Sequence, residues 1–168
     1  MKSDAKKLLE GKRILIVDDE PDILEALEEL LDICQVEKAT NFNDAKALLE
    51  NQPFEMAILD IMGVDGYRLL EKANSRNITA VMLTAHGLSL ENTMKAYKKG
   101  AAFFVPKEKM QDIDIYLADI LEAKSEGKHP WRRWLKRFGS YYKDHFSKEW
   151  DNYEDFWKKA LKDKEKEL

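Results

Sequence analysis

The sequence predicts an α/β fold in which a doubly wound, five-stranded parallel sheet is covered by helices on both faces. Short apolar segments alternate with segments whose apolar residues recur every three or four positions, as strands alternate with amphipathic helices. The segments "RILIV" (13–17), "EMAILD" (55–60) and "ITAVMLT" (78–84) are apolar almost throughout, which is typical of strands buried on both faces. Alternation of this kind predicts a parallel sheet.

The remaining elements follow from the same periodicity. Strands are expected at 13–17, 36–40, 55–60, 78–84 and 101–105, and helices at 21–34, 43–51, 66–75, 89–99 and about 109–123. Pro21 suits a first helical turn because its missing N–H would be unpaired there. Asn43 is expected to cap the second helix, and Gly100 to end the fourth.

The chain has room for one domain of ordinary size and about 40 further residues. We divide it into an N-terminal arm (1–11), an α/β domain (12–123), a linker (124–130) and an aromatic-rich helical extension (131–168). The extension holds all four tryptophans, and its aromatic residues and leucines form one helical stripe. Gly139 and Ser147 are candidate interruptions, which leaves one long helix and a hairpin as equal alternatives.

Composition excludes several classes of protein. A net charge of -4 argues against a mainly electrostatic binder of nucleic acid or membranes. Cys34 is the only cysteine, so an internal disulfide is impossible and a cysteine-based metal site is not expected. The first residues lack the apolar core of a signal peptide, and no apolar run approaches the roughly 20 residues that span a bilayer. We therefore expect a cytoplasmic protein.

Polar residues follow the strands that have the strongest apolar pattern. Asp18 and Asp19 follow the first strand, Asp60 ends the third, Thr84 ends the fourth, and Lys107 follows the fifth. In parallel sheets these ends meet at one edge. Two carboxylates about 4 Å apart repel by about 4 kcal/mol at an effective dielectric of about 20, so three of them need a cation or a proton. An oxygen-only cluster with room for water suits Mg²⁺. Each residue alone has an ordinary explanation as a cap, a turn or a solvated residue, and the agreement of four segments favours a site.

Four segments carry a resemblance to a known family. "ILIVDDEPDILEALEELL", "AILDIMGVDGYRLLE", "VMLTAHG" and "GAAFFVPK" resemble the motifs of response-regulator receiver domains, the phospho-acceptor part of two-component signalling. The motifs occur in the family's order and cover residues 12–123. The resemblance implies a flavodoxin-like sheet with the strand order 2-1-3-4-5.

The resemblance also implies roles for the residues at the strand ends. Asp60 would be the phospho-acceptor, a carboxylate nucleophile that attacks phosphorus. Asp19 and Asp60 would bind Mg²⁺ directly, Asp18 would act mainly through a metal-bound water, and the backbone carbonyl of Met62 would complete the protein ligands.

The resemblance also implies how phosphorylation would change the conformation of the domain. Lys107 and the Thr84 hydroxyl would hold phosphoryl oxygens. Thr84 would move toward the phosphoryl group, and the aromatic residue at position 104 would then turn inward and remodel the face formed by the fourth helix, fifth strand and fifth helix. Phe104 is also compatible with plain core packing, and it lacks the hydroxyl of a tyrosine.

The sequence departs from the family pattern at two loops. The loop "IMGVD" after Asp60 is shorter than usual and lacks proline, which bears most on the Met62 carbonyl; Gly63 is expected to supply the backbone freedom that the tighter loop requires. Glu108 stands where proline usually follows the lysine, so a trans peptide is expected after Lys107.

His86 lies two residues past Thr84, at the expected rim of the site. It is either a solvated loop histidine or, together with Met62, a residue that tunes how fast the phosphoryl group hydrolyses.

The resemblance implies a sensor histidine kinase or a phosphotransfer protein as the phosphoryl donor. No DNA-binding domain is expected in the short extension, so signalling would use protein contacts. The extension either packs on the α/β domain or on a second copy, or offers a docking surface to a partner protein. A homodimer through it, or through the face named above, stays open. Membrane or RNA contact through "WRRWLKRF" (131–138) is disfavoured by the acidic stretch that follows.

Two other functional classes are alternatives for this sequence. A Mg²⁺-dependent phosphohydrolase typically has a second aspartate two residues after the nucleophile, where this chain has Met62. A degenerate receiver acting as a constitutive binding module conflicts with the intact set of polar residues, although the short loop keeps it open. Beyond self-phosphorylation and autodephosphorylation, no enzyme activity is expected.

Overall fold

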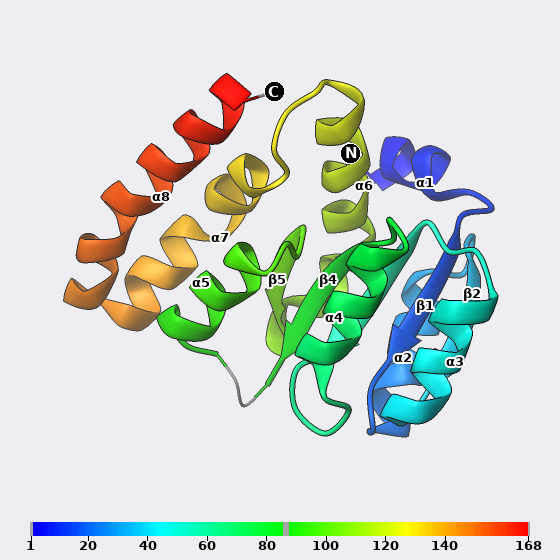
Figure 1. The fold of residues 1–168 in the computed structure, drawn as a ribbon. Coiled ribbons are helices and arrows are strands. Elements are labelled where there is room, and N and C mark those ends of the chain that lie inside the picture. The colour runs from blue at the N-terminus through cyan, green and yellow to red at the C-terminus, as the bar shows by residue number, and fades with distance from the viewer. Residues whose placement is uncertain (1, 86–87, 168) are drawn as a thin grey trace.

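The computed structural model describes residues 2–85 and 88–167 and has the predicted α/β architecture (Figure 1). The strands are β1 (Arg13–Val17), β2 (Gln35–Ala39), β3 (Met56–Asp60), β4 (Thr79–Thr84) and β5 (Phe103–Pro106). All neighbouring pairs are parallel, and the order is β2-β1-β3-β4-β5. The fold class and strand order expected from the sequence are therefore confirmed.

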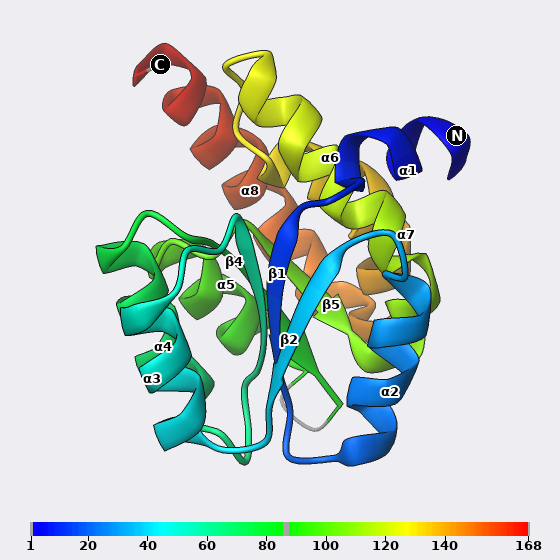
Figure 2. The ribbon, with the colours of Figure 1, turned by 90° about the vertical axis from the view of Figure 1, so that its right-hand side faces the viewer.

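Helices cover both faces of the sheet (Figure 2). The helices α3 (Phe42–Asn51), α4 (Gly66–Ser75) and α5 (Leu90–Lys98) lie on one face, and α2 (Pro21–Leu30) and α6 (Ile113–Ser125) lie on the other. A 3₁₀ helix, η1 (Lys107–Asp112), joins β5 to α6. It occupies the residues where the last helix was expected to begin, so α6 starts later than predicted.

The cap of α3 differs from the prediction. Asn41, not Asn43, is the N-cap: its backbone is extended, and its side-chain oxygen accepts a hydrogen bond of 2.9 Å from the Asp44 N–H. Asn43 lies inside the first turn, because the helix begins at Phe42. Gly100, by contrast, follows α5 with a φ of +91°, as expected for a residue that ends a helix.

The N-terminal arm is helical. Helix α1 (Lys2–Leu9) packs on α6, and Ala5 and Leu9 are buried. These two residues add apolar surface to the core at the edge of the sheet where the strands begin.

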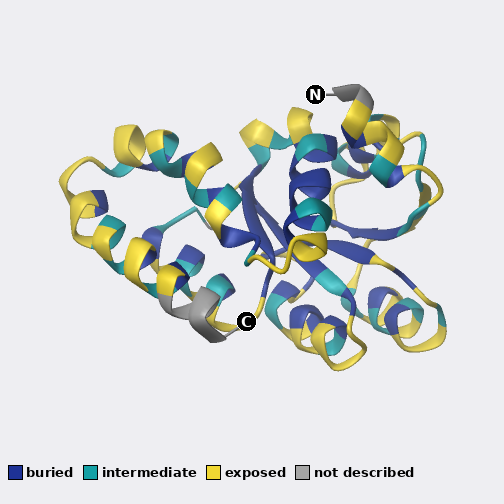
Figure 3. Ribbon diagram, turned by 90° about the horizontal axis from the view of Figure 1, so that it is seen from above, coloured by how far each residue is buried: buried dark blue, intermediate teal, exposed yellow. Residues whose placement is uncertain are grey.

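The C-terminal extension is a hairpin of α7 (Trp131–Phe146) and α8 (Lys148–Glu167). The chain reverses at Ser147, whose φ is +49°, whereas Gly139 lies inside α7. Figure 3 shows buried residues on the inner sides of the two helices and exposed residues on their outer sides. The stripe is continuous with the core of the sheet, through Trp131, Trp134, Phe138, Tyr142, Trp150, Trp157 and Leu161.

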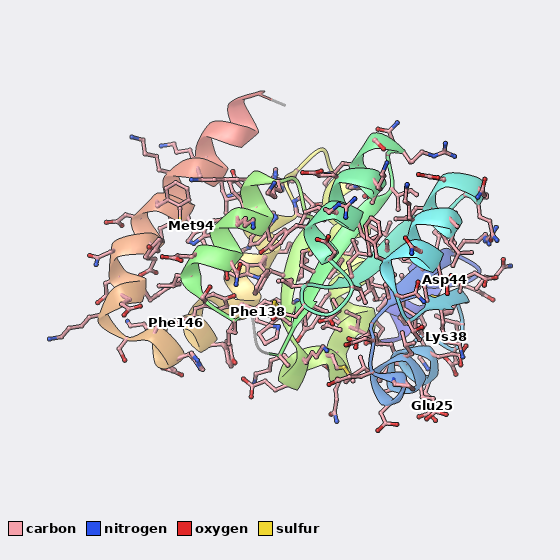
Figure 4. All side chains as sticks on the ribbon, turned by 60° about the horizontal axis from the view of Figure 1, so that its bottom comes forward. Glu25, Lys38, Asp44, Met94, Phe138 and Phe146 are labelled. Carbon is pink, nitrogen blue, oxygen red and sulfur yellow. The ribbon has the colours of Figure 1, made fainter. Side chains whose placement is uncertain are left out.

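The hairpin covers the face formed by α5, β5 and α6. The indole N–H groups of Trp131 and Trp134 donate to the backbone carbonyls of Ala101 and Phe104, at 2.7 and 2.8 Å. Figure 4 shows Met94 of α5 on the side of that helix that faces α8. Since β5 is an edge strand, the hairpin also shields an edge that would otherwise be open to pairing.

Charged residues join α7 to α6. Asp119 of α6 is only 5% exposed, and Arg133 and Arg137 both pair with its carboxylate. Two of the cations of the basic segment 131–138 thus already have a carboxylate partner within the chain, which further weakens a membrane or RNA contact through it. Every helix of the described residues is too short or too polar to cross a bilayer.

Candidate functional site

Three carboxylates meet at the edge where β1 and β3 end. Asp18, Asp19 and Asp60 each offer an oxygen atom, and these atoms lie within 4.8 Å of one another. The strands β1 and β3 are neighbours in the sheet, so the residues that follow them leave from the same edge. Asp18 and Asp60 are buried, whereas Asp19 is exposed. The structure therefore brings together the three predicted acidic residues, with one side of the cluster open to solvent.

Lys107 is the cation that faces this cluster. Its Nζ atom lies 2.8 Å from Asp18 Oδ2, 3.4 Å from Asp60 Oδ1 and 3.5 Å from Glu20 Oε2. Glu20 was not predicted as a site residue, although it follows the two aspartates directly in the sequence. The backbone N–H of Glu20 also donates to Asp18 Oδ1 at 2.9 Å, which fixes the Asp18 side chain.

One lysine does not offset the negative charge. Burial, and next the charge of Asp18, raise the pKa of Asp60 to about 6, against the opposing effect of Lys107. Burial also raises the pKa of Asp18 above its ordinary value. For Lys107, burial lowers the pKa, but the contacts with Asp18, Asp60 and Glu20 outweigh it and raise the pKa. The cluster therefore favours a further cation.

The donor set fits a hydrated Mg²⁺ ion. All the side-chain donors are carboxylate oxygens, and the exposure of Asp19 leaves room for water ligands. Asp18 Oδ2 is fully buried. It forms an ion pair with Lys107, but it accepts no hydrogen bond of regular geometry from the described residues. An additional positive charge would satisfy this oxygen.

Two glycines shape the loop that follows Asp60. Gly63 has a φ of +85°, as the short loop led us to expect, and a Cβ there would lie 2.5 Å from Asp19 Oδ2. A Cβ at Gly66 would overlap the carbonyl oxygen of Asp60. Met62 is 57% exposed, and its role as a carbonyl ligand stays a prediction. The close approach of Gly63 to Asp19 has no local sequence signal beyond the glycine itself.

Thr84 and Lys107 line one side of the site. They border a cavity of about 400 Å³, together with Leu88, Pro106 and Glu108. Thr84 is buried at the end of β4, opposite Pro106 of β5. The peptide that follows Lys107 is trans, as expected. His86 lies outside the described residues.

A further residue of this cavity comes from the extension. His145, near the end of α7, lines the same cavity as Thr84 and Lys107. Sequence reasoning missed it because the contact depends on how α7 packs, and no local motif reports that packing.

Phe104 lies fully buried in β5. This is the core packing that the sequence allowed, and its inward movement on phosphorylation stays a prediction. Its backbone carbonyl accepts the hydrogen bond from Trp134, which links this strand position directly to α7.

Comparison with known proteins gives the family. The model of the response regulator receiver domain matches residues 14–118. The chain therefore belongs to the receiver domain family of response regulators, whose members act in two-component signalling. This family is not a classical enzyme family.

Individual relatives agree with this assignment. The response regulator protein PilR of Pseudomonas aeruginosa is 35% identical over 103 residues, which are 57% of this chain and 23% of PilR. The two-component response regulator ORR25 of Oryza sativa subsp. japonica is 33% identical over 136 residues, 77% of this chain and 18% of that protein. The chain thus spans less than a quarter of these two relatives.

A solved structure that consists almost wholly of the matched domain agrees as well. The crystal structure of a CheY-like response regulator receiver domain protein from Methanospirillum hungatei superposes with a TM-score of 0.61 at 31% identity. The match covers 69% of this chain and 98% of that one.

Proposed function

We propose that this receiver domain accepts a phosphoryl group on Asp60, in a Mg²⁺-dependent transfer from a sensor histidine kinase or a phosphotransfer protein. The observation that carries the proposal is the meeting of Asp18, Asp19, Asp60 and Lys107 at one edge of the sheet, beside Thr84. These are the groups that phosphoryl transfer needs, because its catalysis depends on positioning and on positive charge.

Each residue has a distinct part in the transfer. A carboxylate oxygen of Asp60 forms a bond to phosphorus while the bond from phosphorus to the donor's imidazole nitrogen breaks, and that nitrogen keeps the electron pair. Lys107 and the Thr84 hydroxyl hold phosphoryl oxygens. Asp18, Asp19, Asp60 and the Met62 carbonyl would hold Mg²⁺, which supplies positive charge to the transferring group.

The ionisation of Asp60 also argues for the metal. Since burial and Asp18 raise the pKa of Asp60 to about 6, its nucleophilic carboxylate form is less favoured in the bare cluster than in an ordinary aspartate. A bound cation and Lys107 both favour the carboxylate.

The output would pass through protein contacts that involve the hairpin. The face formed by α5, β5 and α6 is covered by α7 and α8, so a homodimer through that face requires the hairpin to move. The outer side of the hairpin stays available to a partner or to a second copy (Figure 3).

Intact-mass measurement tests the proposal. Wild-type protein incubated with Mg²⁺ and acetyl phosphate should gain the mass of one phosphoryl group. Asp60→Asn should gain none, and EDTA should prevent the gain in the wild type. A wild type that stays at its starting mass while its circular dichroism shows a folded protein would contradict the proposal.

A further inference from the structure

The end of α7 lies beside the side of the site that would hold the phosphoryl group. His145 lines the cavity of about 400 Å³ that Thr84 and Lys107 also line. The family match ends at residue 118, so α7 is an addition to the receiver domain. A residue from outside the family's domain thus forms part of the wall of this cavity.

Neighbouring aromatic rings hold the His145 side chain. Its ring stacks on Tyr141 with a centroid distance of 5.7 Å and an interplanar angle of 25°, and it meets the Phe146 ring edge-on at 4.8 Å. In the part of the chain that the structure describes, His145 makes these ring contacts but no hydrogen bond or ion pair. His145 therefore affects the cavity through the volume of its imidazole ring.

The same turn of α7 is tied to the segment that carries Lys107. The Tyr141 hydroxyl donates a hydrogen bond to the carboxylate of Glu108, the residue that follows Lys107. The ammonium group of Lys109 lies 5.3 Å from the centre of the Tyr141 ring. Tyr141 thus joins the end of α7 to the chain that leaves β5.

Contacts made earlier in α7 fix the position of the turn that carries His145. Tyr142 and Thr93 of α5 share a buried hydrogen bond of 2.7 Å between their hydroxyl groups. Trp134 is bonded to the Phe104 carbonyl. Phe138, which is labelled in Figure 4, packs against Phe103 and Tyr116, with ring centroids 6.2 and 5.1 Å away. The receiver domain thus contacts α7 over about three turns, from Trp131 to Tyr142, before the helix reaches His145.

We propose that α7 completes the phosphorylation site and that His145, as a positioning residue, limits the access of water to the phosphoryl group on Asp60. The inference rests on the proposed function. In hydrolysis, the oxygen of water forms a bond to phosphorus, and the bond from phosphorus to the Asp60 oxygen breaks. That oxygen keeps the electron pair, and a proton of the water passes to solvent, leaving a free carboxylate and inorganic phosphate. His145 is itself an exposed residue, so its ring covers one side of the cavity next to Thr84 and Lys107, and it slows this step by displacing water from that side.

The lifetime of the phosphorylated protein tests the inference. The full chain is phosphorylated with acetyl phosphate and Mg²⁺, desalted, and followed by intact mass. His145→Ala should lose its phosphate about three- to tenfold faster than the wild type, because the cavity is opened to water. His145→Phe keeps an aromatic ring without nitrogen atoms and should restore a lifetime close to that of the wild type.

A control variant and a second test variant complete the experiment. Lys143→Ala changes an exposed residue of the same helical turn that does not line the cavity, and should leave the lifetime unchanged. Tyr141→Phe keeps the ring but removes the hydrogen bond to Glu108, and should shorten the lifetime by releasing the wall. It provides a second test if His145→Ala folds poorly.

The outcomes separate this inference from the proposed function. A wild type that gains no phosphoryl mass contradicts the proposed function before any variant is compared. If the wild type is phosphorylated but His145→Ala and Tyr141→Phe lose phosphate at its rate, the inference is wrong. Slower loss in both His145→Ala and His145→Phe would also overturn it, because the imidazole would then assist the attacking water.

Discussion

The indole N–H of Trp134 donates a 2.8 Å hydrogen bond to the backbone carbonyl of Phe104. Both residues are fully buried. Trp134 belongs to the C-terminal hairpin, and Phe104 is the strand residue that the family resemblance marks as moving on phosphorylation. This hydrogen bond joins the hairpin directly to the part of the domain that is expected to respond to the phosphoryl group.

Activation should therefore loosen the first turns of α7. We expect beryllofluoride with Mg²⁺ to increase amide hydrogen exchange in residues 131–138, because a shift of Phe104 weakens the bond from Trp134. The last turn, which Tyr141 ties to Glu108, should stay in place. Hydrogen exchange with mass spectrometry gives the measurement. Asp60→Asn treated in the same way serves as the control and should not respond. Equal exchange in α7 with and without beryllofluoride would show that the hairpin does not sense the site.

Loss of the Trp134 indole should be costly. Trp134→Phe removes part of a buried ring and leaves the Phe104 carbonyl without its indole donor, so we expect a loss of about 2–4 kcal/mol in the free energy of unfolding. Urea denaturation followed by far-UV circular dichroism measures it. Leu135→Ala on the same helix is the comparison, since Leu135 is only partly buried and should cost less. A cost for Trp134→Phe no larger than that for Leu135→Ala would contradict the assignment.

The fold was predictable because its strands carry strong local patterns. In "RILIV" and "EMAILD" the apolar run and the carboxylates that end it lie within one segment, so element and site residue could be read together. The cap of α3 was not predictable in this way. Asn41 and Asn43 are the same residue type two positions apart, and only the extended backbone at Asn41 distinguishes them.

The rest depends on contacts between distant parts of the chain. Helix α1 contains few apolar residues and gains its order from packing on α6. The position of His145 depends on the packing of α7 against β5 and α5, and Glu20 joins the site only because Lys107 reaches it. Such contacts cannot be predicted from any one segment of the sequence. The apolar stripe that allows α7 to dock, by contrast, can be seen within its own segment.

Gly63 should be essential for metal binding. A Cβ there would lie 2.5 Å from Asp19 Oδ2, so Gly63→Ala displaces a carboxylate that we expect to hold Mg²⁺. We expect the affinity for Mg²⁺ to fall by about tenfold or more, as isothermal titration calorimetry can measure. Gly127→Ala is a matched control, because Gly127 also has a positive φ, +69°, but faces open space. Both variants carry backbone strain of about 1 kcal/mol, and only the first should lose affinity. An equal loss in both would assign the effect to strain alone.

The stability of the metal-free protein should depend on the charge of Asp60. Its pKa of about 6 in the folded protein lies above the ordinary value of 3.8, so the folded state binds the proton more tightly than the unfolded state does. The contribution of Asp60 to stability is therefore greatest below about pH 4, falls as the pH rises toward 6, and stays low above it. Asp60→Asn removes this dependence and should be more stable than the wild type at pH 7, by about 2–3 kcal/mol. Below about pH 4 the two proteins should differ little. Urea denaturation in EDTA across this range measures the difference, and added Mg²⁺ should reduce it by stabilising the wild type. A wild type more stable than Asp60→Asn at pH 7 in EDTA would mean that Lys107 alone balances the cluster.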